Sequence, residues 1–155
     1  MTDSRQLTLD YVIKPEQTFT YINVPFEVPP HTGRIDVAYT YDAAIGSDPT
    51  LIGGNTVDIG IIDPRGAQFM TPGFRGWSGS ARQQFYIAQD SATAGYMPGP
   101  IQPGTWHICL GAYKVAANGC QCRVEKPKLS MSSCEKPRFL RSSFTLMPKA
   151  RKNCS

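Results

Sequence analysis

The two histidines are the first residues to test for catalytic or metal-binding chemistry, because imidazole acts both as a general base and as a metal ligand. His31 falls within a Pro-Pro-His-Thr-Gly turn, and His107 lies on the face of its strand opposite Trp106 and Ile108. Neither has a Cys, His or carboxylate nearby at the spacing of a metal site or a catalytic triad. We therefore expect both to be ordinary structural or surface histidines, and we expect no metal site and no cofactor.

Ser78 is the next candidate, since Gly76-Trp-Ser-Gly-Ser resembles the turn that presents a nucleophilic serine. The second glycine follows the serine directly, so the Gly-x-Ser-x-Gly spacing is not met. The carboxylates are scattered along the chain. Asp58 falls in a strand, and Asp63 heads a turn in which its side chain can cap backbone N–H groups. We expect no enzymatic activity from this chain by itself.

The five cysteines are an odd number without the regular spacing of a disulfide-rich secreted fold. Cys120 and Cys122 would lie on one face of a strand about 7 Å apart, which is too far for an unstrained disulfide. A Cys-x-Cys half-site for a metal is the alternative, but no second Cys or His pair accompanies it. We favour free, packed thiols in a reducing, cytoplasmic environment.

Two glycine-rich segments, residues 73–82 and 95–106, carry aromatic and arginine residues at a density that simple turns do not need. One interpretation is a recognition surface, because Trp, Tyr and Arg dominate binding hot spots. The residues that we select for such a docking or substrate-facing surface are Arg75, Trp77, Arg82, Tyr96 and Trp106. The other interpretation is a pair of ordered loops covering one end of the fold, with Trp77 and Tyr96 packed and Arg75 or Arg82 bonded to carbonyls or Asp90.

The elements that must position these residues are strands. Apolar residues alternate with polar ones over residues 35–41 and 57–61, which is the pattern of a strand with one buried face. Further strands are expected near residues 7–13, 19–21, 84–88 and 105–110. Pro and Gly punctuate the chain between them, and no window shows a long helical period. The fold class expected is all-β: an antiparallel, jelly-roll-like β-sandwich with few helices.

Asn118-Gly119 predicts a two-residue β-hairpin turn. In that register Tyr113, Val115 and Ala117 would pair with Cys120, Cys122 and Val124 on an apolar face. Because Trp106, Ile108 and Leu110 have the opposite phase to Tyr113, we also expect a bulge or bend near Gly111.

The charge distribution divides the chain. Residues 1–125 contain 8 Lys or Arg against 11 Asp or Glu, a net charge of −3, whereas residues 126–155 contain 8 against 1, a net charge of +7. The second segment also lacks Ile, Val, Tyr, Trp and Gly. We expect a β-sandwich domain over 1–125 and a disordered basic tail over 126–155. No segment has the length and apolarity of a signal peptide or a membrane span.

Three strings make the chain recognisable: Val57-Asp-Ile-Gly-Ile-Ile-Asp-Pro-Arg-Gly, Phe74-Arg-Gly-Trp-Ser-Gly-Ser-Ala-Arg, and Ala94-Gly-Tyr-Met-Pro-Gly-Pro-Ile-Gln-Pro-Gly-Thr-Trp. Over about residues 18–125 the chain resembles the N-terminal β-sandwich domain of carbaryl-hydrolase-like metallohydrolases, which join it to a polymerase-and-histidinol-phosphatase (PHP) domain. The resemblance implies hydrolysis at a metal cluster in that downstream domain, opened by a His-x-His string. Residues 126–155 contain no histidine, so no metal ligand is carried over, and we expect a truncated fragment.

The resemblance leads to one preferred function and two alternatives. We expect a non-catalytic accessory domain that packs against a PHP-type catalytic domain. A carbohydrate-binding module with Trp77, Tyr96 or Trp106 as its stacking platform is the second hypothesis. Binding of nucleic acid or anionic lipid by the basic tail is the third, and the least favoured, since the tail carries no recognised motif.

Overall fold

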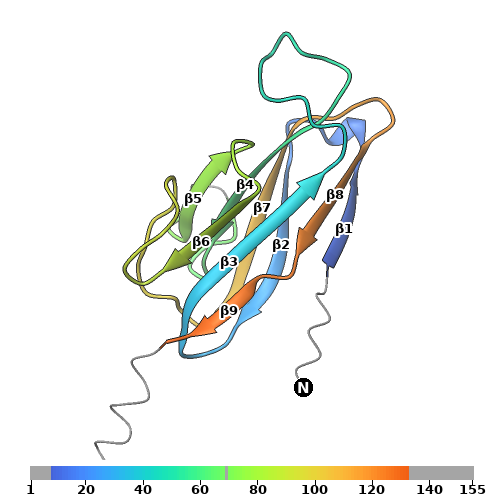
Figure 1. The fold of residues 1–155 in the computed structure, drawn as a ribbon. Helices are drawn as coiled ribbons and strands as arrows, with labels where there is room; N and C mark the ends of the chain where they lie inside the picture. Colours follow the sequence, from blue (N-terminus) through green and yellow to red (C-terminus); the bar gives the residue numbers. More distant parts are fainter. Residues whose placement is uncertain (1–7, 69, 133–155) are drawn as a thin grey trace, which may run out of the picture.

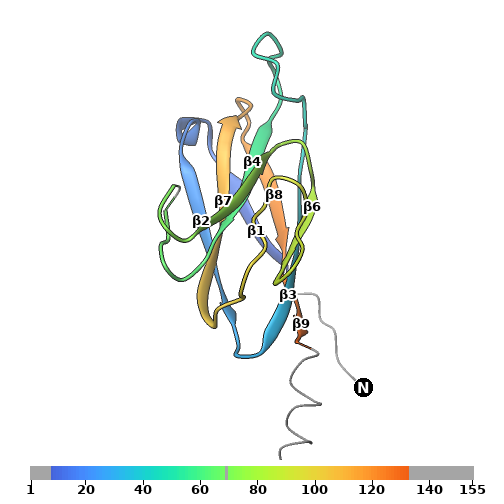
Figure 2. The ribbon, with the colours of Figure 1, turned by 90° about the vertical axis from the view of Figure 1, so that its left-hand side faces the viewer.

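The computed structural model describes residues 8–68 and 70–132, which form two antiparallel β-sheets packed face to face (Figures 1 and 2). The strands are β1 (Thr8–Ile13), β2 (Tyr21–Val28), β3 (Thr32–Tyr41), β4 (Thr56–Ile62), β5 (Phe74–Gly79), β6 (Gln84–Ala88), β7 (Gly104–Lys114), β8 (Cys120–Glu125) and β9 (Lys128–Met131). A single 3-10 turn, η1 (Pro15–Gln17), is the only helical element in the described part of the chain.

The strand order shows how the two sheets are built. One sheet has the order β1-β8-β3-β6, with β9 also paired to β3, and the other has the order β2-β7-β4-β5. The first four strands thus pair in reverse order with the next four, as β1·β8, β2·β7, β3·β6 and β4·β5. The additional β3·β8 and β4·β7 ladders join these four strand pairs into two sheets that pack as layers. This is jelly-roll topology, so the prediction of an antiparallel, jelly-roll-like sandwich is confirmed.

The core forms where the alternating strands face each other. Ile35, Val37 and Tyr39 of β3 point inward from one sheet, and Ile59 and Ile61 of β4 point inward from the other. The Trp106 side chain is also fully buried between the sheets. The strands predicted near residues 7–13, 35–41, 57–61, 84–88 and 105–110 are present, because burying one face of each satisfies the period-two pattern. Of residues 19–21 only Tyr21 lies in a strand, since Phe19 is in the turn before β2.

Two strands differ from their sequence-based prediction. Residues 74–79 were expected to lie in a loop but form β5, an edge strand whose ladder with β4 is interrupted by two register shifts. Glycines at these positions weaken the alternation by which a strand is recognised. β2 runs on through Pro25 to Val28, which is tolerated because β2 lies at a sheet edge and pairs only with β7.

The predicted hairpin at Asn118-Gly119 is wrong. A turn does form there, since the N–H of Gly119 donates to the carbonyl of Ala116 at 2.8 Å. However, β7 and β8 lie in different sheets, and β8 pairs with β1 and β3 instead. Cys120 and Cys122 are buried, as the alternation of apolar and polar residues in this strand predicted. Local alternation identifies the buried face of a strand but not its partner, and the long β1·β8 ladder decides the partner.

The predicted irregularity in β7 is present, two residues beyond Gly111. Val57 pairs with Ala112 and Thr56 pairs with Lys114, so Tyr113 is the extra residue of a bulge. Every second residue of β7 from Trp106 to Ala112 points into the core.

The domain boundary at residue 125 also needs correction, because β9 belongs to the sandwich. β8 and β9 pair one after the other with the same edge of β3: Tyr39 pairs with Val124 of β8, and Asp36 pairs with Lys128 of β9. The register shifts by one residue between them, at Lys126–Pro127. Pro127 lacks an N–H to continue the ladder, and this explains the break. The rest of the predicted tail, residues 133–155, lies outside the described residues. No helix within the described ranges is long and apolar enough to cross a membrane.

Candidate functional site

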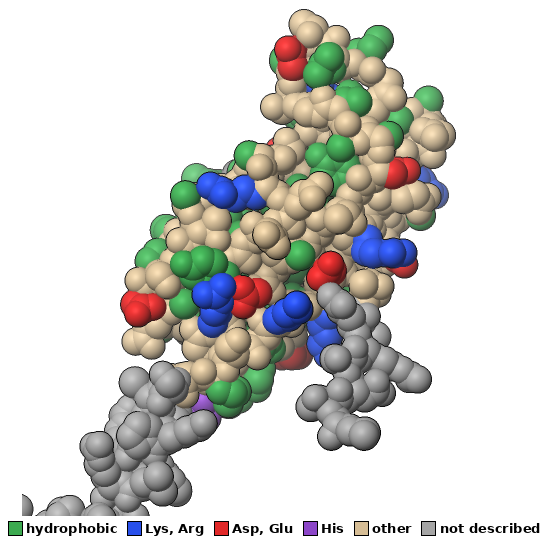
Figure 3. Space-filling model, viewed as in Figure 1, with side chains coloured by type: hydrophobic (Ala, Val, Ile, Leu, Met, Phe, Trp, Pro, Cys, Tyr) green, Lys and Arg blue, Asp and Glu red, His purple; other side chains and the backbone are tan. Residues whose placement is uncertain are grey.

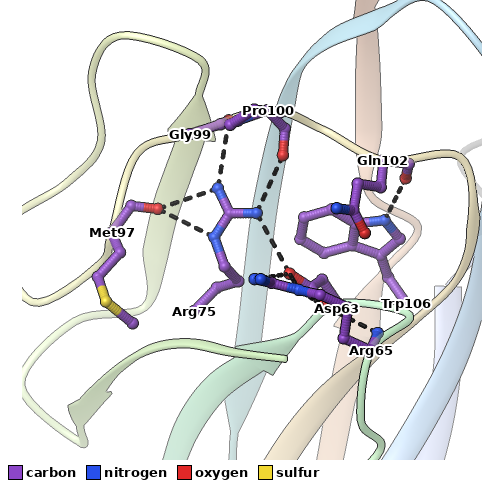
Figure 4. Close-up of polar contacts among 8 residues, drawn as sticks. All are labelled: Asp63, Arg65, Arg75, Met97, Gly99, Pro100, Gln102 and Trp106. Carbon is purple, nitrogen blue, oxygen red and sulfur yellow. Dashed lines mark hydrogen bonds and ion pairs between the residues drawn. The ribbon is translucent and has the colours of Figure 1, made fainter. Parts of the chain in front are cut away.

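Arg75 is buried at the centre of a hydrogen-bonded cluster (Figure 4). Its guanidinium donates to the carbonyls of Met97 at 3.1 and 3.2 Å, Gly99 at 3.3 Å and Pro100 at 3.1 Å. It also contacts the buried carboxylate of Asp63 at 3.5 Å. Arg75 therefore fastens the 97–100 segment to β5 and to the end of β4.

Asp63 is the anionic centre of the same cluster. Arg65 binds it with two side-chain nitrogens, the closer at 2.7 Å, and its own backbone N–H donates at 2.9 Å. Burial by itself raises the pKa of Asp63, but the hydrogen bonds from Arg65 and the charge of Arg75 outweigh it and hold the pKa below its ordinary value. Every group in this cluster has a partner, so its role is to hold loops in place.

Tyr96 and Trp106 are buried as well. The ring of Tyr96 stacks on Phe85 with centroids 3.9 Å apart, and its hydroxyl donates to the Ile59 carbonyl at 3.2 Å. The indole N–H of Trp106 donates to the Gln102 carbonyl at 2.8 Å (Figure 4). The prediction that Arg75, Tyr96 and Trp106 belong to a docking or substrate-facing surface is therefore wrong for the described chain. Neither aromatic ring can serve as a sugar platform from inside the core.

The remaining two predicted residues lie in different elements, Trp77 on β5 and Arg82 in the connection between β5 and β6. Arg82 is exposed and borders a hollow on the outer face of the β3·β6 region. Trp77 is half-buried on the outer face of the sheet β2-β7-β4-β5. The five selected residues thus do not form one surface, and only Trp77 belongs to the candidate site described below.

Trp77 lies flat on its sheet because two glycines leave room for the indole. A Cβ at Gly60 would stand 2.4 Å from Trp77 Cε3, and a Cβ at Gly111 would stand 3.0 Å from Cη2. The ring of Tyr21 meets the indole edge-on, with centroids 6.0 Å apart. Nearby, Phe19 and Tyr113 make a second edge-on pair at 6.0 Å. We call the four rings of Phe19, Tyr21, Trp77 and Tyr113 the aromatic face.

The aromatic face is open to solvent. Phe19 is 77% exposed and Tyr21 is 57% exposed, values that are high for large apolar side chains. Phe19 also has a φ of 68°, in the left-handed region that disfavours a side chain. Its backbone N–H donates to the carbonyl of Ala112 at 2.6 Å, which ties this strained residue to β7. Strain held in this way often marks a binding site.

Asp58 lies in a small pocket within the aromatic face, which we call the Asp58 pocket. Its volume is about 160 Å³, and its lining includes Phe19, Tyr21, Asp58 and Tyr113. In the sheet, Gly111 is the direct neighbour of Asp58 on β4 and of Tyr21 on β2. Because strands are spaced about 4.8 Å apart, Asp58 and Tyr21 lie on either side of Gly111, against which the Trp77 indole packs.

The Asp58 carboxylate has no compensating charge. No hydrogen bond or ion pair joins it to any described residue, and burial alone raises its pKa above the ordinary value. The nearby ammonium of Lys114 is bound instead by the carbonyls of Asp48 and Leu51. The half-buried Asp58 carboxylate thus lies beside four aromatic rings without a partner among the described residues.

The sequence analysis missed most of this site. Asp58 was noted only as a strand residue, and Tyr113 was placed on an inward face by the hairpin register. One signal was present: Asp58 alternates with Val57 and Ile59, which places it on an outward face. What the alternation does not show is that Gly111 and Tyr21 lie beside it, because both come from distant strands.

A broader hollow of about 540 Å³ lies on the outer face of the other sheet, where Figure 3 shows basic and acidic side chains interspersed. Arg34 there is already bound by Asp36 at 2.7 Å and lies over the Tyr86 ring at 3.8 Å. Arg82, Lys126 and Lys128 also line it. Mixed charge of this kind is typical of a solvated face, so we rank this hollow below the aromatic face.

The two histidines and the three described cysteines do not belong to a cluster of metal ligands within the described chain. His31 occupies the turn between β2 and β3 with a φ of 68°. His107 is half-buried on the outer side of β7, as predicted, and its Nδ1 has no hydrogen-bond partner within the described chain. Cys120 and Cys122 are free and packed in the core, where burial raises the pKa of each thiol to about 12. No group of three or more potential metal ligands occurs among residues 8–68 and 70–132.

Comparison with known proteins does not assign the chain to a family. No protein-family model matches the chain, and no curated protein matches it.

Proposed function

We propose that this chain is a non-catalytic accessory domain that packs against a PHP-type metallohydrolase domain through its aromatic face. The exposure of Phe19 and Tyr21 beside Trp77 is the observation that carries the proposal. Clustered, exposed aromatic rings mark protein interfaces, because their burial releases water from a large apolar area at little cost in side-chain entropy.

The strings that resemble the PHP-associated domain support the choice of this face. The Phe74–Arg82 string forms β5 and places Trp77 on the aromatic face, while its Arg75 points to the opposite side and fastens the neighbouring loop. The Asp63-Pro-Arg-Gly string supplies the carboxylate and the second arginine of that cluster. The recognisable residues thus build one end of the sandwich and present one ring of the aromatic face.

Association of the full chain with a separately produced PHP domain from a carbaryl-hydrolase-like protein tests the proposal. We expect binding by biolayer interferometry, and loss of bound dye from the exposed rings when the domain is added. Phe19→Ser together with Tyr21→Ser should weaken binding by about tenfold or more, as expected for interface aromatics. The matched control is Ile52→Ser, which removes an 89% exposed side chain from the loop between β3 and β4. A monodisperse chain that ignores the PHP domain would contradict the proposal.

Carbohydrate binding is the competing function, and the aromatic face also bears on it. Exposed rings beside a carboxylate are able to stack on a sugar and accept its hydroxyls. With Tyr96 and Trp106 buried, the platform would consist of Trp77 and Tyr21. A glycan array separates the two functions, because docking predicts no sugar binding.

Binding by the basic tail is the third candidate. Lys126 and Lys128 are its described cations, and both line the hollow on the β3 face. Deleting residues 133–155, which keeps β9 intact, should strongly weaken any salt-sensitive binding to nucleic acid or anionic lipid if the tail is responsible. Free buried thiols favour a reducing, cytoplasmic location, which imaging of the tagged chain tests.

A further inference from the structure

The Asp58 pocket combines a carboxylate that lacks a partner with aromatic rings that already surround it. The carboxylate is half-buried on β4, and no described residue donates to it or pairs with it. Phe19, Tyr21 and Tyr113 contribute to the walls, and the backbone of Gly111 and Ala112 contributes to the floor. Because the carboxylate is only half-buried, a ligand from solvent can reach it and supply the opposite charge.

We propose that the Asp58 pocket binds an organic ammonium group, with the Asp58 carboxylate as counter-ion and the rings of Tyr21, Tyr113 and Phe19 as its walls. The proposal deepens the proposed function and rests on the same aromatic face. It adds the chemical class that the face recognises.

The chemistry of the pocket selects an ammonium cation over other ligands. Aromatic ring faces attract cations through their quadrupole, and quaternary ammonium ligands are recognised in this way by aromatic cages. A hard metal ion is disfavoured, since Ca²⁺ and Mg²⁺ require several oxygen ligands and Asp58 is the sole carboxylate in the lining. A neutral sugar would leave the charge of Asp58 uncompensated.

The size of the pocket fits the same class. Its volume of about 160 Å³ is close to that of a cavity that holds one benzene molecule. It therefore accommodates one compact organic head group. Gly111 in the lining makes room for the neighbouring indole, because a Cβ there would stand 3.0 Å from the Trp77 ring and 3.4 Å from Asp58 Cβ.

Two-dimensional NMR titration of the full chain tests the proposal. Choline chloride is the first probe and n-butylammonium chloride, which mimics a lysine side chain, is the second; sodium chloride at equal ionic strength is the control. We expect saturable shifts confined to the amides around Asp58, Gly111 and Tyr21. Asp58→Asn should weaken binding by about tenfold or more, because the amide keeps the shape but loses the charge. The matched control, Asp36→Asn on the other sheet, should bind as the parent chain does.

A second variant separates the rings from the charge. Tyr21→Leu keeps an apolar side chain but removes the quadrupole, and should weaken choline binding severalfold while leaving the fold intact by circular dichroism. Saturation by choline alone identifies a small quaternary amine as ligand, and saturation by n-butylammonium identifies a lysine of a partner; either supports the proposal. Shifts equal to those with sodium chloride, or binding unaffected by Asp58→Asn, would overturn it.

The two proposals fail separately. Docking to the PHP domain is measured without added amine, so docking without amine binding removes only the ammonium site. Amine binding without docking removes only the accessory role.

Discussion

Two carboxylates at β4, five residues apart in the sequence, have opposite environments. Asp63 is fully buried, yet Arg65 and Arg75 supply charge and hydrogen bonds, and its pKa is lowered. Asp58 is only half-buried, has no partner among the described residues, and its pKa is raised. The comparison shows that satisfaction, more than burial, distinguishes a structural carboxylate from one available to a ligand.

Breaking the satisfied cluster should have the largest effect. Arg75→Met leaves Asp63 with one arginine and strips three loop carbonyls of their donor. We expect the free energy of unfolding to fall by about 3–5 kcal/mol, as when one partner of a buried ion pair is removed. Urea denaturation of the full chain measures this. Arg82→Met, at an exposed position, is the control and should change stability by less than about 0.5 kcal/mol. Equal effects of the two variants would contradict the structural role of Arg75.

The packing of Trp77 beside Asp58 is tested by its two glycines. Gly60→Ala should cost about 1–3 kcal/mol, because the new Cβ meets the indole at 2.4 Å and the backbone oxygen of Gly76 at 2.7 Å. Gly111→Ala should cost less, since its closest contacts are to the Trp77 side chain at 3.0 and 3.1 Å. Thermal unfolding compares the variants. The reverse order would mean that Trp77 does not lie across Gly60.

The unsatisfied carboxylate should make removal of its charge stabilising. Because the pKa of Asp58 is raised in the folded chain, its protonated form favours folding at low pH, and this contribution is lost as pH rises through the folded pKa. Asp58→Asn should therefore stabilise the fold at pH 7 and have little effect at low pH. Unfolding curves across pH measure the difference.

Asp63→Asn is the matched comparison, and its sign is opposite. The lowered pKa of Asp63 contributes stability above the unfolded pKa that is lost as pH falls through the folded one. Asp63→Asn should accordingly destabilise the fold most at neutral pH. If both substitutions destabilised the chain at pH 7, the contrast between the two sites would fail.

The smallest effect on stability is expected at Phe19. Phe19→Gly relieves a left-handed conformation worth about 1–2 kcal/mol but adds about 0.5–1 kcal/mol of backbone entropy cost, so the net change should stay within about 1 kcal/mol. Choline binding should still fall, because the ring is lost from the Asp58 pocket. Ile52→Gly, which is exposed but not left-handed, should show no compensating gain. A large loss of stability in Phe19→Gly would show that its ring is part of the packing.

Much of the fold follows from local patterns. The alternation of Ile35, Val37 and Tyr39 predicts β3, and the run from Gln84 to Ala88 predicts β6 with its observed bounds. The candidate functional site was harder to predict from local sequence patterns. Arg75 was selected as a binding residue because arginine is common in hot spots, whereas the structure confirms the alternative interpretation, in which Arg75 bonds to loop carbonyls.

The buried face of each strand could be predicted from the amino-acid sequence, because two-residue alternation and the free energy of apolar burial act within a single strand. Which strands are neighbours became known only from the folded chain. In the folded chain β8 pairs with β1 and not with β7, and β9 is part of the sandwich. Arg75 and Trp106 are buried, and Tyr21, Gly111 and Asp58 are neighbours across three strands. Strand pairing depends on contacts between distant segments, and the energy of such contacts is shared among many residues and leaves no local pattern.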